Sequence, residues 1–244
     1  MSGTTKLDRL AARGRPILAC YFVMGDEDFD DALRDIYVEE GVDIFELGIP
    51  SVDPYLDGSD IAGAMARVIG AGGDGYDRIA EVSAWLATHP SASAGVCMAY
   101  ADLDVARVAG LPLDGALVIG DADRAITVAG VPQCGLLPLD QDRWDLDAAR
   151  SWDGYVMIQA ADGKTGPRDT LDPRLAETIA SARRAAIVRP LLAGFGIGTP
   201  QQAREAVDAG ADGVVIGSMC VRNVRRGKNE IRHFLRDVRS ALDA

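Results

Sequence analysis

Hydrophobic residues along this chain gather in short runs, and longer polar or amphipathic stretches separate them. Eight runs are brief and almost continuously apolar, which is typical of parallel strands that are buried on both faces. The predicted strands cover residues 16–23, 42–48, 93–100, 115–120, 134–139, 154–160, 189–195 and 212–218.

Helical patterns fill most of the stretches between these runs. The predicted helices cover residues 28–41, 60–73, 76–90, 172–185, 199–210 and 229–243. The helix at 199–210 has clear ends, because Thr199 is a good N-cap, Pro200 suits the first turn and Gly210 ends the pattern. Eight repeats of strand and helix predict an α/β protein, a single (β/α)8 TIM barrel over residues 1–244. The connectors at 101–113 and 121–132 are short, so the helices after strands 3 and 4 should be stunted.

The composition limits the classes of partner. The chain has 244 residues, a formal net charge of −12 and 48% hydrophobic residues. This acidity argues against binding to nucleic acid or to an anionic membrane. A phosphorylated small molecule is compatible with it, because backbone amides can hold a phosphate without a basic surface.

The cysteines and the N-terminus predict a cytoplasmic protein. No apolar run approaches the ~18 residues of a membrane span, and the first residues lack the apolar core of a signal peptide. The four cysteines lie far apart, without a spacing that suggests zinc, so we expect buried free thiols in a reducing compartment. They are Cys20, Cys97, Cys134 and Cys220.

Two acidic residues are candidates for catalysis. They lie near the carboxyl end of a predicted strand, which is where the active sites of such barrels are found. Glu46 is near the end of the second predicted strand, and Asp57 is in the loop that follows. A carboxylate inside an apolar barrel is unfavourable unless it is paired or its pKa is raised. Glu46 is therefore either a structural acid, bound by an arginine or a backbone amide, or a general acid/base near neutrality.

Glycine-rich segments after the last two strands predict a phosphate site. GFGIGTP (194–200) and IGS (216–218) occupy the positions from which this fold frequently builds one. The GKT of the loop 161–167 is not a Walker A motif, because Ile158 stands where that motif requires glycine. We interpret Lys164 as a solvated loop charge rather than a Schiff-base lysine, and the basic run 222–228 as a solvated helix face rather than an anion contact. Asp121 either lines the pocket or caps a turn.

Four segments together resemble the alpha subunit of tryptophan synthase, an indole-3-glycerol-phosphate lyase. They are ELGIPSVDPYLDG (46–58), YVMIQAADGKTG (155–166), GFGI (194–197) and GS (217–218), and the match runs in order over essentially the whole chain. The resemblance implies a retro-aldol cleavage of indole-3-glycerol phosphate to indole and glyceraldehyde 3-phosphate, with no metal and no organic cofactor. It also implies a tryptophan synthase beta subunit as partner.

The resemblance assigns roles by position. Glu46 is the expected catalytic acid/base, and Asp57 is the expected acceptor of the indole N–H. Thr165 matches the threonine that orients this aspartate, while Tyr21 and Phe195 match aromatic residues beside the indole. The expected phosphate cradle consists of Gly166, Gly196, Gly217 and Ser218.

The chain also departs from the family pattern. Ser51 and Val52 replace a Phe-Ser pair, and Leu56 replaces alanine, in a loop that faces the beta subunit in the family. With the short connectors, these changes predict a weakened or altered interface. Met157 replaces an active-site tyrosine, which predicts the loss of a hydroxyl near Glu46. Two alternatives follow: a retro-aldol or isomerase enzyme for another phosphorylated aromatic, or a weakly active regulatory subunit of a pyridoxal-phosphate-dependent beta partner. Retention of both acids argues against the second.

Overall fold

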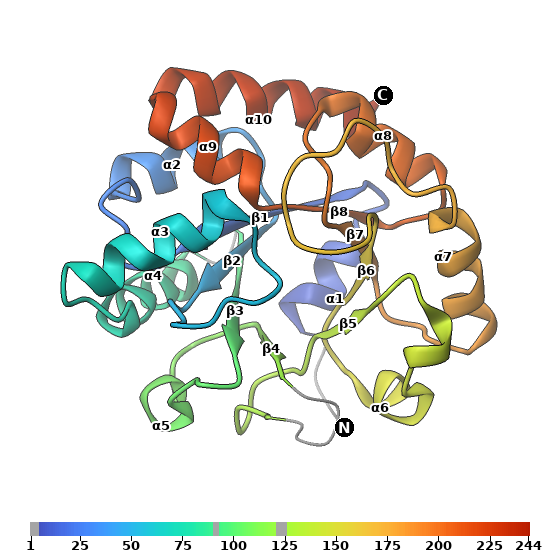
Figure 1. The fold of residues 1–244 in the computed structure, drawn as a ribbon, viewed down its shortest axis with the longest axis horizontal. Coiled ribbons are helices and arrows are strands. Elements are labelled where there is room, and N and C mark those ends of the chain that lie inside the picture. Colours follow the sequence, from blue (N-terminus) through green and yellow to red (C-terminus); the bar gives the residue numbers. More distant parts are fainter. Residues whose placement is uncertain (1–4, 90–92, 121–125) are drawn as a thin grey trace.

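The chain folds into a parallel β-barrel surrounded by helices (Figure 1). The structure is a computed structural model that describes residues 5–89, 93–120 and 126–244. Within these residues, eight strands form one sheet in the order β4-β3-β2-β1-β8-β7-β6-β5. A parallel bridge joins Ala116 of β4 to Gln133, two residues before β5, and nearly closes the barrel. The strands are β1 (Ile17–Val23), β2 (Ile44–Gly48), β3 (Ala94–Tyr100), β4 (Gly115–Ile119), β5 (Gly135–Leu137), β6 (Val156–Gln159), β7 (Leu191–Gly194) and β8 (Gly213–Ile216). The predicted (β/α)8 fold is confirmed, and every predicted strand is present with shorter ends.

Helices surround the strands in Figure 1, and all six predicted helices are present. They are α2 (Asp31–Glu39), α3 (Ser59–Gly70), α4 (Tyr76–Thr88), α7 (Leu175–Arg184), α8 (Pro200–Asp208) and α10 (Lys228–Asp243). Helix α8 begins as predicted, with the Thr199 hydroxyl accepting the Gln202 N–H at 3.1 Å. The connector after β3 holds only α5 (Val105–Val108), and residues 126–132 after β4 hold no helix, so the predicted shortening is confirmed in the described part.

The sequence patterns missed several short elements. They are α1 (Lys6–Ala11), α6 (Leu146–Ser151), α9 (Ser218–Arg226) and the 3₁₀ turn η1 (Gln141–Arg143). Only Gly217 separates β8 from α9, so no polar break marks where α9 begins, although the basic run 222–228 was interpreted as a helix face. Helix α1 contributes Leu7 and Leu10 to the interior of the barrel, although only these two of its residues are buried. Elements with so few buried positions give almost no periodic signal.

Two apolar layers explain why the strands are continuously hydrophobic. Alternate residues of β1, such as Ala19 and Tyr21, pack inside the barrel. Their neighbours, such as Cys20 and Phe22, pack outward against the helices. Both faces of each strand are therefore buried, as expected for a parallel sheet. The four cysteines are free and buried, as predicted; the reducing compartment stays a prediction. No helix in the described part of the chain is long and apolar enough to cross a membrane.

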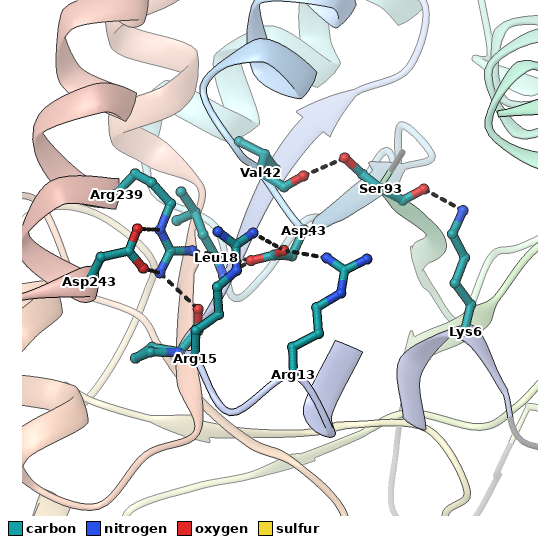
Figure 2. A network of polar contacts seen from close by, with 10 residues as sticks. Lys6, Arg13, Arg15, Leu18, Val42, Asp43, Ser93, Arg239 and Asp243 are labelled. Atoms are coloured by element: carbon teal, nitrogen blue, oxygen red, sulfur yellow. Dashed lines mark hydrogen bonds and ion pairs between the residues drawn. The ribbon is translucent and has the colours of Figure 1, made fainter. Parts of the chain in front are cut away.

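A buried acid ties both ends of the chain to the amino-terminal side of the barrel (Figure 2). Asp43, just before β2, is 4% exposed. Its carboxylate accepts hydrogen bonds from the Leu18 N–H at 3.1 Å, from Arg15 at 2.8 Å and from Arg239 of α10 at 3.2 Å. Arg239 also donates to the Pro16 carbonyl oxygen at 2.9 Å. This network lies at the end of the barrel that in this fold serves stability rather than catalysis.

Candidate active site

One pocket at the carboxyl ends of the strands contains all the site residues that the sequence predicts. Its free space is about 440 Å³, part of which is open to solvent, and this size suits a small molecule. The predicted residues along its wall are Tyr21, Glu46, Asp57, Thr165, Gly166, Phe195, Gly196, Gly217 and Ser218. Apolar side chains that the sequence did not single out for the site, Ile61, Met98, Ile197 and Val215, complete the wall together with Met157.

Glu46 lies on β2, is 0% exposed and points into the barrel. One carboxylate oxygen accepts a hydrogen bond from the Tyr155 hydroxyl, and the other has no partner among the described residues. Burial raises the pKa of Glu46 from 4.5 to about 7, the Tyr155 hydrogen bond opposes this rise and Asp57 adds to it. No described arginine, lysine or backbone amide binds this carboxyl, so the geometry favours an acid/base over a structural ion pair.

The sequence analysis missed Tyr155. Met157 brings no hydroxyl to the pocket wall, as expected, but the buried Tyr155, two residues earlier, donates its own hydroxyl to Glu46. The alternation of a strand is the signal that could have found it, because Tyr155, the residue before β6, is two positions from Met157 and so shares its face. Tyr100, at the end of β3, was missed in the same way.

Replacing Tyr155 with phenylalanine should raise the pKa of Glu46 above about 7, because the hydroxyl stabilises the charged carboxylate. A hydrogen bond to a charged group contributes about 1.5–3 kcal/mol, so we expect a rise of roughly one to two pH units. Infrared titration of the carboxyl band that Glu46→Gln removes would measure it. Tyr37→Phe is the matched control, since Tyr37 is equally buried but does not contact Glu46. An unchanged or lowered pKa in Tyr155→Phe would contradict the assignment.

Asp57 is held by two hydroxyl groups. It is 4% exposed, and its two oxygens accept hydrogen bonds from the Tyr100 hydroxyl at 2.7 Å and from the Thr165 hydroxyl at 3.0 Å. Burial raises the pKa of Asp57, and the two hydroxyls and Lys164 partly offset the rise. Each oxygen therefore has a fixed direction, which leaves the carboxylate oriented rather than free to rotate.

Thr165 also joins the loop after β6 to the loop after β2. Its hydroxyl accepts the Gly58 N–H at 2.9 Å, and its own N–H donates to the Leu56 carbonyl oxygen at 2.7 Å. A side chain at position 58 would overlap the Thr165 carbonyl oxygen, so this close approach requires glycine. In Figure 1 the loop between β6 and α7 arches over the strand ends. The two loops together close one side of the pocket.

The predicted phosphate cradle combines tight backbone turns with a helix N-terminus. Gly166 and Gly196 have φ of +138° and +89°, and a Cβ at Gly196 would lie 2.9 Å from the Ala161 Cβ. Gly217 and Ser218 begin α9, whose first turn has no side-chain cap. The Ser218 hydroxyl is buried and has no partner among the described residues. Free amides and positive dipole at a helix N-terminus suit an anion.

Three buried polar atoms of this pocket lack a hydrogen-bond partner in the described chain. They are the Tyr21 hydroxyl, one oxygen of Glu46 and the Ser218 hydroxyl. Buried polar groups are rarely left unpaired, and such groups gathered in one pocket indicate a polar ligand. The pocket thus combines two buried acids, a helix N-terminus of the kind that suits an anion, and apolar side chains.

Lys164 and the basic run 222–228 do not line this pocket. Lys164 is exposed on its loop, as predicted. In the basic run 222–228, Arg222 pairs with Asp60 at 2.7 Å and Lys228 with Asp30 at 2.6 Å, which agrees with a solvated helix face. Asp121 falls outside the described residues.

Comparison with known proteins identifies the family. A sequence model of the family described as "Tryptophan synthase alpha chain" matches residues 7–243. The chain belongs to the tryptophan synthase alpha chain family. Tryptophan synthase alpha chains of Novosphingobium aromaticivorans and of an Azoarcus species are 31% and 32% identical to it, each comparison covering 98% of this chain and 96% of the relative.

Solved structures carry the same fold. A tryptophan synthase structure from Mycobacterium tuberculosis superimposes with a TM-score of 0.80 at 22% identity, covering 98% of this chain and 97% of that chain. The tryptophan synthase subunit alpha of Legionella pneumophila gives a TM-score of 0.78 at 22% identity, with the same two coverages. The stunted connectors therefore leave the tryptophan synthase alpha barrel intact.

The departures from the tryptophan synthase alpha pattern have different environments. Ser51 is buried, and its hydroxyl donates to Asp102 at 2.9 Å, which links the loops after β2 and β3. Leu56 packs against the barrel interior, whereas Val52 is 81% exposed. Of the three substitutions, only Val52 therefore changes the outer surface of this loop strongly.

Proposed function

We propose that this chain is a carbon–carbon lyase that cleaves indole-3-glycerol phosphate to indole and glyceraldehyde 3-phosphate. The observation that carries the proposal is one pocket that joins two buried acids to an anion site. Glu46, with a pKa of about 7, can hold and release a proton at neutral pH. The phosphate cradle lies in the same pocket, with an apolar wall of the kind that an indole ring needs.

The residues fit a retro-aldol reaction in which Glu46 carries out both proton transfers. Protonated Glu46 gives its proton to indole C3, and the positive charge that spreads to the ring nitrogen is stabilised by Asp57. The side-chain hydroxyl next to C3 then returns a proton to Glu46 as its oxygen forms a carbonyl. The C–C bond breaks, and its electron pair restores the aromatic ring. Glu46 ends protonated, so each turnover begins from the same state.

The other residues position the substrate. Tyr21 and Phe195 flank the space for the indole ring, and the phosphate cradle holds the other end of the molecule. Thr165 fixes the direction of the Asp57 carboxylate through the 3.0 Å hydrogen bond. Holding both ends of the substrate converts binding energy into orientation at the bond that breaks.

We also propose a tryptophan synthase beta subunit as partner, bound at the loop after β2. Val52 is 81% exposed and Tyr55 is 42% exposed on this loop, and exposed apolar side chains are a common feature of docking surfaces. The interface differs from the family pattern chiefly at Val52, so we expect binding to a beta subunit to be weaker than in complexes that keep the Phe-Ser pair.

Purified protein should release indole from indole-3-glycerol phosphate, measured by absorbance or chromatography with and without a beta subunit. Release by the chain alone supports a stand-alone lyase, and release only on adding the beta subunit identifies a partner-dependent one. Absence of indole under both conditions, in protein that is folded by circular dichroism, would defeat the proposal. In that case, stimulation of the beta subunit's own reaction would assign the chain a regulatory role.

A further inference from the structure

A buried glutamine joins the two loops that carry the phosphate cradle. Gln202 lies on α8 and is 5% exposed. Its side-chain oxygen accepts the Gly198 N–H at 2.8 Å, and its side-chain nitrogen donates to the Arg168 carbonyl oxygen at 2.7 Å. The first contact is in the loop after β7 and the second in the loop after β6. The side-chain amide of Gln202 therefore accepts a hydrogen bond from one loop and donates a hydrogen bond to the other.

Arg168 anchors the middle of the loop between β6 and α7. Its N–H donates to the Gly196 carbonyl oxygen at 3.3 Å, so this part of the loop rests on a residue of the predicted cradle. Its guanidinium folds back and donates to the carbonyl oxygens of Lys164 at 2.9 Å and Asp162 at 3.4 Å. Among the described residues it forms no ion pair. The side chain thus holds the shape of the loop, and Gln202 holds the backbone of Arg168 in place.

The tip of the same loop reaches the second acid. Thr165 lies three residues before Arg168 and bonds Asp57 and Gly58. A continuous set of contacts therefore runs from Gly198 and Gln202 through Arg168 to Thr165 and Asp57. Gln202 does not line the pocket, so it has no direct contact with a bound substrate.

We infer that Gln202 is a positioning residue that couples occupancy of the phosphate cradle to the placement of Asp57. The inference rests on the proposed function, because it gives the anion site and Asp57 one common substrate. An anion held between Gly196 and Gly166 fixes the two loops relative to each other, and Gln202 transmits this constraint to the loop that carries Thr165. Without the Gln202 bridge, the 3.3 Å hydrogen bond from the Arg168 N–H to the Gly196 carbonyl oxygen still joins the loops, but phosphate binding no longer orders Asp57.

Gln202→Glu provides a test that uses pH. The ionised carboxylate can accept the Gly198 N–H but cannot donate to the Arg168 carbonyl oxygen, and two oxygens then face each other. A protonated carboxyl has one donor and one acceptor and restores both bonds. At pH 8 we expect kcat/KM for indole-3-glycerol phosphate to fall roughly tenfold. Relative to the unsubstituted protein at each pH, this loss should largely disappear by pH 5.5.

Two comparisons separate positioning from general damage to the fold. Gln201→Glu is the matched control, because Gln201 is exposed and its side-chain nitrogen donates to Glu205 on the same helix at 2.8 Å. It should leave kcat/KM unchanged at both pH values. Gln202→Met, which has neither donor nor acceptor, should lose activity at both.

Hydrogen exchange with inorganic phosphate gives a readout that needs no catalysis. Phosphate should slow amide exchange in both 194–199 and 161–168 of the unsubstituted protein, but only in 194–199 of Gln202→Met. Equal protection of both segments in the variant, or a loss in Gln202→Glu that does not depend on pH, would overturn the inference. Failure of the unsubstituted protein to release indole would instead defeat the proposed function, and the exchange result would still decide whether the loops are coupled.

Discussion

Glu46→Gln should reduce indole release by at least about a thousandfold, because one carboxyl both donates the proton to indole C3 and accepts the proton from the side-chain hydroxyl. General acid/base groups typically contribute 10²- to 10⁴-fold, and here the same group serves two proton transfers. The amide keeps the size of the side chain and can still accept the Tyr155 hydroxyl, so the pocket should stay intact. Steady-state release of indole at saturating substrate measures the effect.

Substrate binding should survive this change, because the phosphate cradle and Asp57 are untouched. Isothermal titration with glycerol 3-phosphate should give a dissociation constant within about threefold of the unsubstituted protein, a difference below 1 kcal/mol. Glu177→Gln is the control, since Glu177 lies on the exposed side of α7 and its partners in the described part of the chain are residues of that helix. Full activity in Glu46→Gln would remove Glu46 from the mechanism. Lost activity together with lost binding of glycerol 3-phosphate would point to a damaged pocket.

Asp43→Ala should lower the free energy of unfolding by about 3 kcal/mol. Removing one member of a buried charge network leaves its partners without compensation, and such changes typically lower stability by 3–5 kcal/mol. We place the effect at the lower end because Arg239 keeps its bond to Asp243 at 2.7 Å and Arg15 is partly exposed. The network in Figure 2 holds both ends of the chain against β2, so its loss should loosen the whole barrel.

Urea unfolding, followed by circular dichroism, measures this change as a shift of the midpoint. Asp208→Ala is the control, because Asp208 is exposed and its ion-pair partner among the described residues is Arg204 of the same helix; such an exposed pair contributes less than 1 kcal/mol. Indole release at 25 °C should be nearly unchanged in folded Asp43→Ala, since Asp43 lies at the opposite end of the barrel from the pocket. A midpoint equal to that of Asp208→Ala would show that the network does not support the fold.

The barrel could be predicted from the sequence because burial on both faces leaves an uninterrupted apolar run for every strand. The ends were less certain, since a strand of four residues such as Val156–Gln159 is flanked by residues that are also apolar. The start of helix α9 was missed for a related reason: only Gly217 separates Ser218 from the end of β8, and no polar segment marks the beginning of the helix.

The site could be predicted only as far as its motifs are local. Glu46 and Asp57 stand in one segment, and the glycines of the cradle follow strands that were already recognised. The groups that tune the acids come from distant parts of the chain: Tyr155 is 109 positions from Glu46, and Tyr100 is 43 positions from Asp57. Such pairs depend on which side chains from different strands meet inside the barrel, and the hydrophobic pattern of the sequence does not specify this. The same limit applies to Gln202, whose proposed role depends on hydrogen bonds to two separate loops.

Burial of Glu46 makes folding a proton-uptake reaction. The carboxyl has a pKa of 4.5 in an unfolded chain and about 7 in the folded protein. Between these values the folded state binds more protons than the unfolded state, so the free energy of unfolding falls as the pH rises. The full loss, reached above pH 7, is about 3 kcal/mol for a difference of this size. A buried carboxyl inside the barrel thus lowers the resistance of the protein to alkaline unfolding.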